Sequence, residues 1–174
     1  MNENGMENRV LEALRREGRP LAPETVFEAF EAEERDAVAS AVEQLLGESR
    51  LILTRKRKLA LPEQTGLIYG RIQGNARGYG FFIPEDGSPD LFIADAMHGA
   101  MHGDKVWVRQ ADTVSRNGNA EAEVMLIAIR AQANIVGTFE QGQGAPGGYV
   151  IPDDPRIYSD LLVYEAASGG AKHG

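Results

Sequence analysis

The sequence contains no cysteine, a single tryptophan and no long apolar run. The lack of cysteine excludes disulfide bonds and thiolate metal sites. A membrane-spanning helix needs about 18 or more consecutive apolar residues, and no stretch of the chain approaches that length. The polar start, MNENGMENR, also lacks the apolar segment of a secretion signal. Together, these absences predict a cytoplasmic protein that does not associate with a membrane.

The chain is also short of basic residues, with 18 Lys and Arg against 26 Asp and Glu and a net charge of −8. Because phosphate favours a basic surface, this balance argues against a uniformly nucleic-acid-binding protein. The charge is segregated, however. Residues 50–58, RLILTRKRK, carry five basic groups and no acid, whereas residues 24–36 carry six acids and one Arg. This distribution predicts that the chain binds RNA weakly and with strong salt dependence. Most of the affinity for RNA would then come from another part of the protein.

Residues 77–94, RGYGFFIPEDGSPDLFIA, form the most informative stretch of the chain. In a β-strand, residues two apart share a face, so Tyr79 and Phe81 point the same way and Phe82 points the other. The turn-forming EDGSPD segment precedes a second strand, which brings Phe92 beside that pair. Three rings in a row favour stacking on unpaired bases. The alternative is that the rings fill the core of a barrel.

The first 64 residues have the pattern of three small helices followed by a hairpin. Apolar residues recur at helical spacing over residues 6–17, over a short segment from Pro23, and over residues 34–47. The period then changes to two, so RLIL and KLALP indicate two strands joined by the basic tip TRKRK. This outline predicts a winged-helix domain over residues 6–64. The tip supplies four candidate phosphate contacts, although exposed cations at a hairpin tip often serve solubility alone. These are Arg55, Lys56, Arg57 and Lys58.

An all-β domain follows, predicted for residues 66–131. Trp107 alternates with Val106 and Val108, so we expect it on the opposite face from those valines. The Asn- and Gly-rich residues 112–119 are expected to form a loop. Five strands are enough to close an OB-type barrel. The strand candidates are residues 67–73, 79–84, 90–94, 105–110 and 123–129.

The pattern partly restarts at Ile135. The segment IVGTFEQGQGAPGGYVIPDDPRIYSDLLV echoes GRIQGN, GFFIP and DLFI in the same order. Residues 134–174 supply about three strands, which are too few to close a five-stranded barrel. We therefore expect an α+β, multidomain chain that ends inside a second OB-fold, with an unpaired edge near residues 161–164.

The ring stretch resembles the two ribonucleoprotein motifs of cold-shock domains, which are five-stranded OB-fold barrels. Over residues 70–110, GRIQGNARGYGFFIP, DLFIA and AMHGDKVWVRQ together resemble the first cold-shock domain of the ribonuclease R family of 3′-to-5′ exoribonucleases. In that family a winged helix precedes the first cold-shock domain and a second one follows it. The resemblance implies an N-terminal part that binds single-stranded RNA and guides it to a downstream catalytic domain. The implied RNA-binding residues are Arg71, Arg77, Tyr79, Phe81 and Phe92.

No catalytic group is expected in this chain. Hydrolysis of a phosphodiester by Mg²⁺ needs several converging aspartates, and the resemblance assigns that cluster, and Mg²⁺ itself, to the downstream domain. His98 and His102 are four residues apart and Asp104 follows. Because Gly99 and Gly103 interrupt any helix there, we expect neither a metal site nor another cofactor in this chain.

Two other functions stay open. In a free-standing regulator, the winged helix would bind duplex DNA. Alternatively, it would be a protein-interaction module, which the acidic residues 24–36 fit at least as well. A helix that enters the major groove usually carries Arg and Lys. The expected exposed positions of the third helix are poor in both, which tells against the DNA-binding alternative. They include Glu34, Ala37, Glu43 and Gln44.

Overall fold

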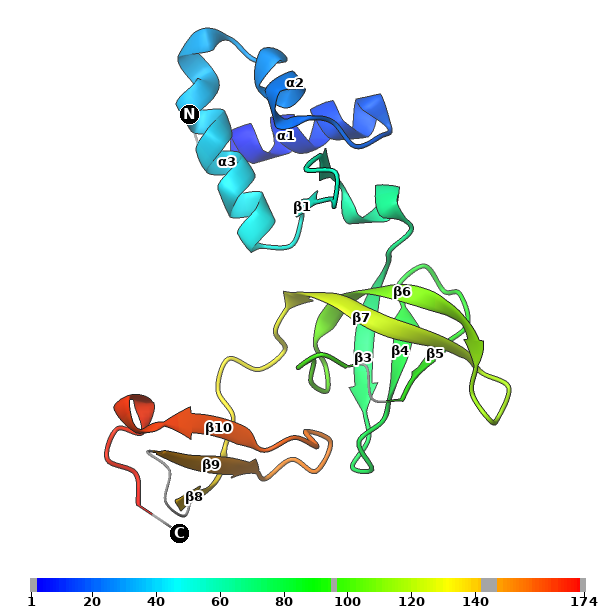
Figure 1. Cartoon of the computed structure of the whole chain (residues 1–174), viewed down its shortest axis with the longest axis vertical. Coiled ribbons are helices and arrows are strands. Elements are labelled where there is room, and N and C mark those ends of the chain that lie inside the picture. Colours follow the sequence, from blue (N-terminus) through cyan, green and yellow to red (C-terminus); the bar gives the residue numbers. More distant parts are fainter. Residues whose placement is uncertain (1–2, 95–96, 142–146, 173–174) are drawn as a thin grey trace.

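The computed structural model describes residues 3–94, 97–141 and 147–172 (Figure 1). Three parts follow one another along the long axis of the molecule: a helical unit, a closed β-barrel and a three-stranded sheet. The hydroxyl of Ser49 in the helical unit donates to the carbonyl of Ile127 in the barrel at 3.4 Å. The helical unit and the barrel therefore touch directly.

The helical unit contains α1 (Glu3–Glu17), α2 (Pro23–Glu28), α3 (Arg35–Gly47), and a hairpin of β1 (Ile52–Leu53) and β2 (Leu59–Ala60). The predicted helices and hairpin are thus confirmed as elements, although each strand has only two residues. α1 ends at Gly18, whose left-handed φ of 65° disfavours a side chain. None of the helices in the described ranges is long and apolar enough to cross a membrane.

One apolar core joins all the elements of the helical unit. Apolar residues at helical spacing in α1 and α3 face each other, and the strands of the hairpin close the open side. The buried members are Met6, Val10, Leu11, Leu14, Leu21, Val26, Val38, Ala41, Val42, Leu45, Leu51, Leu59 and Leu61.

The barrel closes in the order β3-β4-β5-β7-β6. Its strands are β3 (Ile68–Gly74), β4 (Gly80–Pro84), β5 (Leu91–Ile93), β6 (Lys105–Val114) and β7 (Ala120–Ile129). Adjacent strands are antiparallel except β5 and β7, which close the barrel in parallel at the pair Phe92 and Glu121. The five predicted strands are confirmed.

The predicted loop over residues 112–119 is too long. β6 continues to Val114, which pairs with Ala120 at the start of β7. The pairing of β6 with β7 is interrupted by register shifts, which let the long hairpin curve around the barrel. Its low apolar content made this outer part of the hairpin resemble a loop, because both faces of the ribbon are largely exposed there.

Alternation decides which side chains fill the barrel. In β6, Val106 and Val108 are fully buried while Trp107 lies on the other face, as predicted. The buried core comprises Ile72, Phe82, Leu91, Ile93, Ala100, Val106, Val108, Ala122 and Val124. This core is separate from that of the helical unit.

The last part is an open antiparallel sheet in the order β10-β9-β8. Its strands are β8 (Gly137–Gln141), β9 (Gly147–Pro152) and β10 (Leu161–Tyr164). β10 lies at one edge of this sheet, as predicted for residues 161–164. The Gly-rich turn predicted between β8 and β9 falls on residues 142–146, which lie outside the described residues.

Candidate nucleic-acid interface

Three aromatic rings form a cluster on the outer face of the barrel, at β4 and β5. The ring centroids of Tyr79 and Phe92 are 5.6 Å apart, as are those of Phe81 and Phe92, while Tyr79 and Phe81 are 6.0 Å apart. Phe81 and Phe92 are direct cross-strand partners. These spacings are typical of favourable edge and tilted contacts between aromatic rings. We call this cluster of Tyr79, Phe81 and Phe92 the ring patch.

The ring patch is not part of the barrel core. Its three side chains are half-buried, whereas Phe82, the residue after Phe81, is fully buried among the core residues. The strand alternation therefore sends Phe81 out and Phe82 in, as the sequence predicts. The alternative in which all the rings fill the barrel is wrong for the ring patch.

Polar side chains surround the ring patch on β3 and in the turn that follows it. Gln73 is the cross-strand partner of Phe81, and the exposed Arg71 lies two residues earlier on the same face of β3. Arg77 is exposed in the turn between β3 and β4, where its backbone N–H donates to Asn75 Oδ1 at 3.0 Å. By register, Arg71 thus lies near Phe81 on the barrel surface, and Arg77 precedes Tyr79 by two residues in the turn.

A further cation, Lys105 on β6, was missed by the sequence analysis. It is the cross-strand partner of Arg71, and its Nζ lies 2.8 Å from Glu85 Oε1 and 5.8 Å from the ring centroid of Tyr69. The hydrogen bond with Glu85 raises the pKa of Lys105. The alternation in KVWV, which sends Val106 inward, was the signal that would have placed Lys105 on the outer surface.

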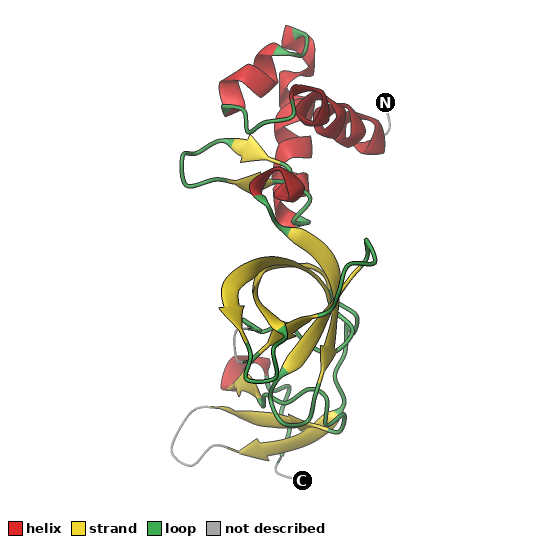
Figure 2. Cartoon of the chain, turned by 90° about the vertical axis from the view of Figure 1, so that its right-hand side faces the viewer, coloured by secondary structure: helices red, strands yellow, loops and turns green. Residues whose placement is uncertain are grey.

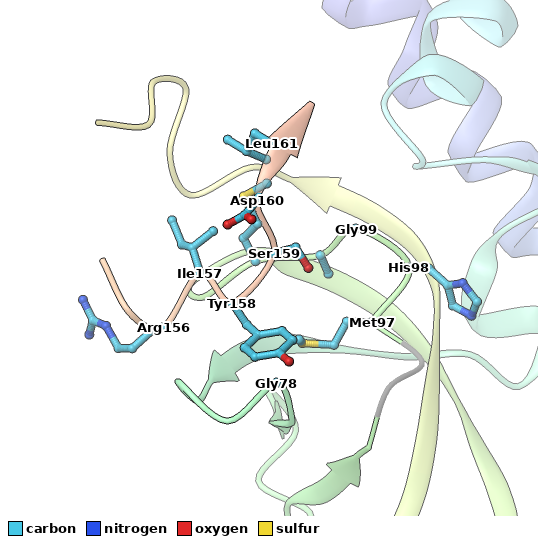
Figure 3. Close-up of a pocket in the computed structure, with 12 residues that line it drawn as sticks. Gly78, Met97, His98, Gly99, Arg156, Ile157, Tyr158, Ser159, Asp160 and Leu161 are labelled. Carbon is cyan, nitrogen blue, oxygen red and sulfur yellow. The ribbon is translucent and has the colours of Figure 1, made fainter. Parts of the chain in front are cut away.

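The loop between β9 and β10 packs on the β3–β4 end of the barrel. A Cβ added to Gly78 would lie 2.9 Å from the ring of Tyr158, and one added to Gly74 would lie 2.6 Å from the carbonyl oxygen of Arg156. Figure 3 shows Tyr158 beside Gly78, with Met97 directed toward the same ring. The two glycines therefore allow the third part of the chain to approach the barrel closely.

His102 lies at this contact. Its Nδ1 accepts a hydrogen bond from the Gly74 N–H at 3.2 Å. Burial, followed by the positive charges of Arg156 and Arg71, lowers the pKa of His102. Arg156 in turn binds both carboxylate oxygens of Asp154, at 2.9 and 2.8 Å, and lowers the pKa of Asp154 to about 2. The lowered pKa favours the neutral imidazole, whose Nδ1 accepts the Gly74 N–H.

The two histidines and Asp104 have different partners. His98 Nε2 lies 3.1 Å from Glu123 Oε1. Asp104 accepts the Ala131 N–H and pairs with Arg130, each at 2.8 Å. The part of the chain that the structure describes contains no group of three or more His, Asp or Glu able to hold a metal ion.

The basic hairpin tip is confirmed as a turn between β1 and β2, and it projects from the helical unit (Figure 2). Arg55, Lys56 and Arg57 are exposed, and Lys58 is half-buried. These cations belong to the helical unit and the ring patch to the barrel, so the two predicted groups form separate surfaces.

The barrel sequence matches a known domain family. Residues 70–127 match the family model described as "Ribonuclease B OB domain". The closed five-stranded barrel agrees with this assignment. The barrel is therefore an OB-fold, of the type found in ribonuclease B proteins.

Relatives that align with most of this chain define the family more narrowly. The chain is 30% identical over 172 residues to ribonuclease R of Vibrio parahaemolyticus, an alignment that covers 95% of this chain and 20% of that protein. It is 33% identical over 128 residues to ribonuclease R of Escherichia coli, which covers 73% of this chain and 15% of that protein. The chain belongs to the ribonuclease R family and corresponds to an N-terminal region of it.

The chain spans a fifth or less of the length of these two relatives. Among solved structures, it is similar to Mycoplasma genitalium RNase R in complex with ribose methylated single-stranded RNA. That similarity has a TM-score of 0.43 and 23% sequence identity, and covers 51% of this chain and 14% of the other.

Proposed function

We propose that this chain is the RNA-binding N-terminal part of a ribonuclease R-like 3′-to-5′ exoribonuclease, and that its ligand is single-stranded RNA. The observation that carries the proposal is the ring patch, in which Tyr79, Phe81 and Phe92 lie on an outer barrel face with centroids 5.6 to 6.0 Å apart. Half-buried rings on a surface have solvent-accessible area on which a base can stack.

Stacking explains why the ligand is single-stranded. In a duplex the faces of the bases are already covered by their neighbours, whereas an unpaired strand can turn successive bases onto aromatic rings. Each stacked base contributes on the order of 1–3 kcal/mol without a sequence requirement. Arg71 and Arg77 are exposed at positions close to the ring patch in register and in sequence, and in this proposal their guanidinium groups contact phosphate or the edge of a base.

The proposal includes a winged helix over residues 6–64. Its support is the order of the elements, in which α1, α2 and α3 precede a hairpin that shares their apolar core. The first OB domain takes residues 66–131. In this arrangement the wing cations Arg55, Lys56, Arg57 and Lys58 are predicted phosphate contacts.

The proposal also makes residues 134–174 the first part of a second OB-fold. The support is the strand register, because the sheet β8-β9-β10 reproduces the pairing of β3-β4-β5 residue for residue. Four matched pairs illustrate this. Gly137 with Pro152 matches Gly70 with Pro84, Glu140 with Tyr149 matches Gln73 with Phe81, Val150 with Leu161 matches Phe82 with Leu91, and Gly148 with Val163 matches Gly80 with Ile93.

Catalysis is assigned elsewhere in this proposal. A downstream domain of the family would carry the aspartates and the Mg²⁺ that cleave the phosphodiester. The residues of this chain would bind the strand and guide it to that domain. No chemical step is assigned to them.

The test is the affinity of the chain for a short fluorescein-labelled oligouridine. Tyr79→Ala and Phe81→Ala should each weaken binding by about 1–3 kcal/mol, or roughly 5- to 150-fold in Kd, because each removes a stacking surface. Tyr164→Ala is the matched control, because Tyr164 is 68% exposed but lies on β10, outside the ring patch. Equal affinity of the wild-type protein and both ring variants would overturn the proposal.

A second candidate function is a protein-interaction module in the helical unit. It is favoured over duplex DNA binding by the surface of α3, whose one cation is Arg35 at its first residue, while the exposed Ala37, Glu43 and Gln44 are not basic. Glu34, expected on this surface, instead precedes α3 and pairs with Arg9 at 2.6 Å. Titration with duplex DNA separates these alternatives. Measurable binding of duplex DNA, abolished by substitutions in α3, would favour the free-standing DNA-binding regulator over the protein-interaction module.

A further inference from the structure

A basic hollow lies beside the hairpin tip of the helical unit. It has a volume of about 450 Å³ and is lined by Arg19, Pro20, Thr54, Arg55, Lys56 and Lys58. Four of these six residues are cations and none is an acid, although the whole chain carries a net charge of −8. The hollow is therefore locally basic, although the chain as a whole is acidic.

Arg19 reaches the hollow because a pair of backbone hydrogen bonds ties the loop after α1 to the hairpin. The Leu21 N–H donates to the Leu59 carbonyl at 2.9 Å, and the Leu59 N–H donates to the Leu21 carbonyl at 2.8 Å. Both leucine side chains are buried in the helical core. This pairing joins segments far apart in the sequence, so no local sequence pattern associates Arg19 with the four tip cations.

The hairpin tip is held in one conformation by its own hydrogen bonds. The Thr54 N–H donates to the Lys58 carbonyl at 2.9 Å, and the Lys58 N–H donates to Thr54 Oγ1 at 3.1 Å. Arg57 takes a left-handed φ of 54° at the turn, and it does not line the hollow. The tip is thus a defined turn whose cations converge from its two sides.

The charges of the hollow are poorly compensated. Within the described residues, Arg55, Lys56 and Lys58 form no ion pair, and Arg19 has only a 3.9 Å contact with Glu17 between exposed side chains. An exposed pair at that distance contributes little. Uncompensated cations around a concave surface attract an anion more strongly than the same cations on a flat one.

We propose that this hollow binds a phosphate group of the RNA backbone, with Arg19 as a phosphate contact in addition to the tip cations. The choice of ligand rests on the proposed RNA-binding function. Oxyanions of phosphate suit the hollow because the guanidinium groups of Arg19 and Arg55 offer forked donors and the lysines offer point charges. The contact is independent of sequence and adds a salt-sensitive component to the stacking on the ring patch.

The experiment measures oligouridine affinity against salt concentration for the whole chain. Arg19→Ala and Lys56→Ala should each lower affinity and reduce the slope of log K against log salt by about 0.7, the value for one single-strand phosphate contact. Arg16→Ala is the matched control, since Arg16 is an exposed cation of the same unit that does not line the hollow. Equal slopes for Arg19→Ala and Arg16→Ala would overturn the proposal.

Two further variants distinguish the hollow from a diffuse charge effect and from the ring patch. Arg15→Ala removes another exposed cation of the helical unit that does not line the hollow. It should leave the slope near that of the wild-type protein, and a loss equal to that of Lys56→Ala would mean a diffuse charge effect and overturn the hollow. Tyr79→Ala should lower affinity at an unchanged slope, so failure of the ring patch is distinguishable from failure of the hollow.

A final experiment tests whether the hollow binds a phosphate group of RNA or a free phosphate ion. Inorganic phosphate, titrated at constant ionic strength, should compete with oligouridine only weakly if the hollow takes one phosphate of a longer strand. Tight binding of inorganic phosphate that Arg19→Ala abolishes, with no change in RNA affinity, would assign the hollow to a free anion and overturn the RNA assignment.

Discussion

At the scale of single residues, two adjacent phenylalanines of β4 have different environments and different expected roles. Phe81 lies in the ring patch, half-buried, and Phe82 lies in the core with no exposed surface. The core side is also crowded, because a Cβ added to Gly70 would lie 2.6 Å from the Phe82 ring. Substitutions at neighbouring positions should therefore affect different properties.

Phe82→Ala should lower the free energy of unfolding by about 3–5 kcal/mol, the usual cost of removing a buried phenylalanine. Phe81→Ala should cost less stability, because its ring already contacts solvent. Urea denaturation followed by the fluorescence of Trp107, the single tryptophan, measures both. Equal losses of stability would mean that Phe81 is also a core residue.

His102 makes the contact between the barrel and the β9–β10 loop sensitive to pH. Its pKa in the folded protein lies below the ordinary value of 6.5, because burial and the charges of Arg156 and Arg71 oppose protonation. As pH falls below 6.5, the unfolded chain takes up this proton more readily than the folded one. Folding stability contributed at this position is therefore present above that pH and is lost on acidification.

The measurement is the melting temperature of the wild-type protein and of His102→Asn from about pH 7.5 to about pH 5.5, the range in which histidine titrates. Asparagine can still accept the Gly74 N–H but does not titrate. We expect a steeper fall for the wild-type protein. Asp154 stays ionised throughout, since its pKa is about 2. Parallel curves would show that His102 does not titrate at this contact.

At the scale of elements, simple periodicity predicted most of the fold. Apolar spacing located α1, α2, α3 and the five barrel strands, and alternation placed Tyr79, Phe81 and Phe92 on one face. The same rules failed where burial is weak, since the exposed outer hairpin of β6 and β7 resembled a loop. They also missed Arg19, Tyr158 and Arg156, whose positions depend on contacts between segments remote in sequence.

The open sheet offers an internal comparison for the ring patch. By register, Tyr149 occupies the position of Phe81, and Leu162 that of Phe92. Both side chains are exposed, at 45% and 57%, but only one of the two carries a ring. The outer face of β9 and β10 therefore has part of the stacking surface that β4 and β5 provide.

Tyr149→Ala should accordingly weaken oligouridine binding less than Phe81→Ala does, because the cross-strand partner of Tyr149 is Leu162, which offers no second ring for stacking. The two variants are compared in the same titration. A larger loss for Tyr149→Ala would move the principal binding surface from the barrel to the open sheet.

At the scale of the whole molecule, the helical unit and the barrel have separate apolar cores. Leu45→Ala, at a fully buried position of α3, should destabilise the helical unit by about 2–5 kcal/mol. Helical circular dichroism should then be lost at lower urea concentration, while the fluorescence of Trp107, which packs against Tyr69 in the barrel, keeps its midpoint. A common shift of both signals would mean that the two units unfold together.

The ring patch lies on an open outer face of the barrel and not in a closed cavity, and this has a topological consequence. An open face can be approached from the side, so a polymer can lie across it anywhere along its length. A terminus need not be threaded. Closed circles of unpaired nucleotides would therefore reach Tyr79, Phe81 and Phe92 as readily as linear strands do.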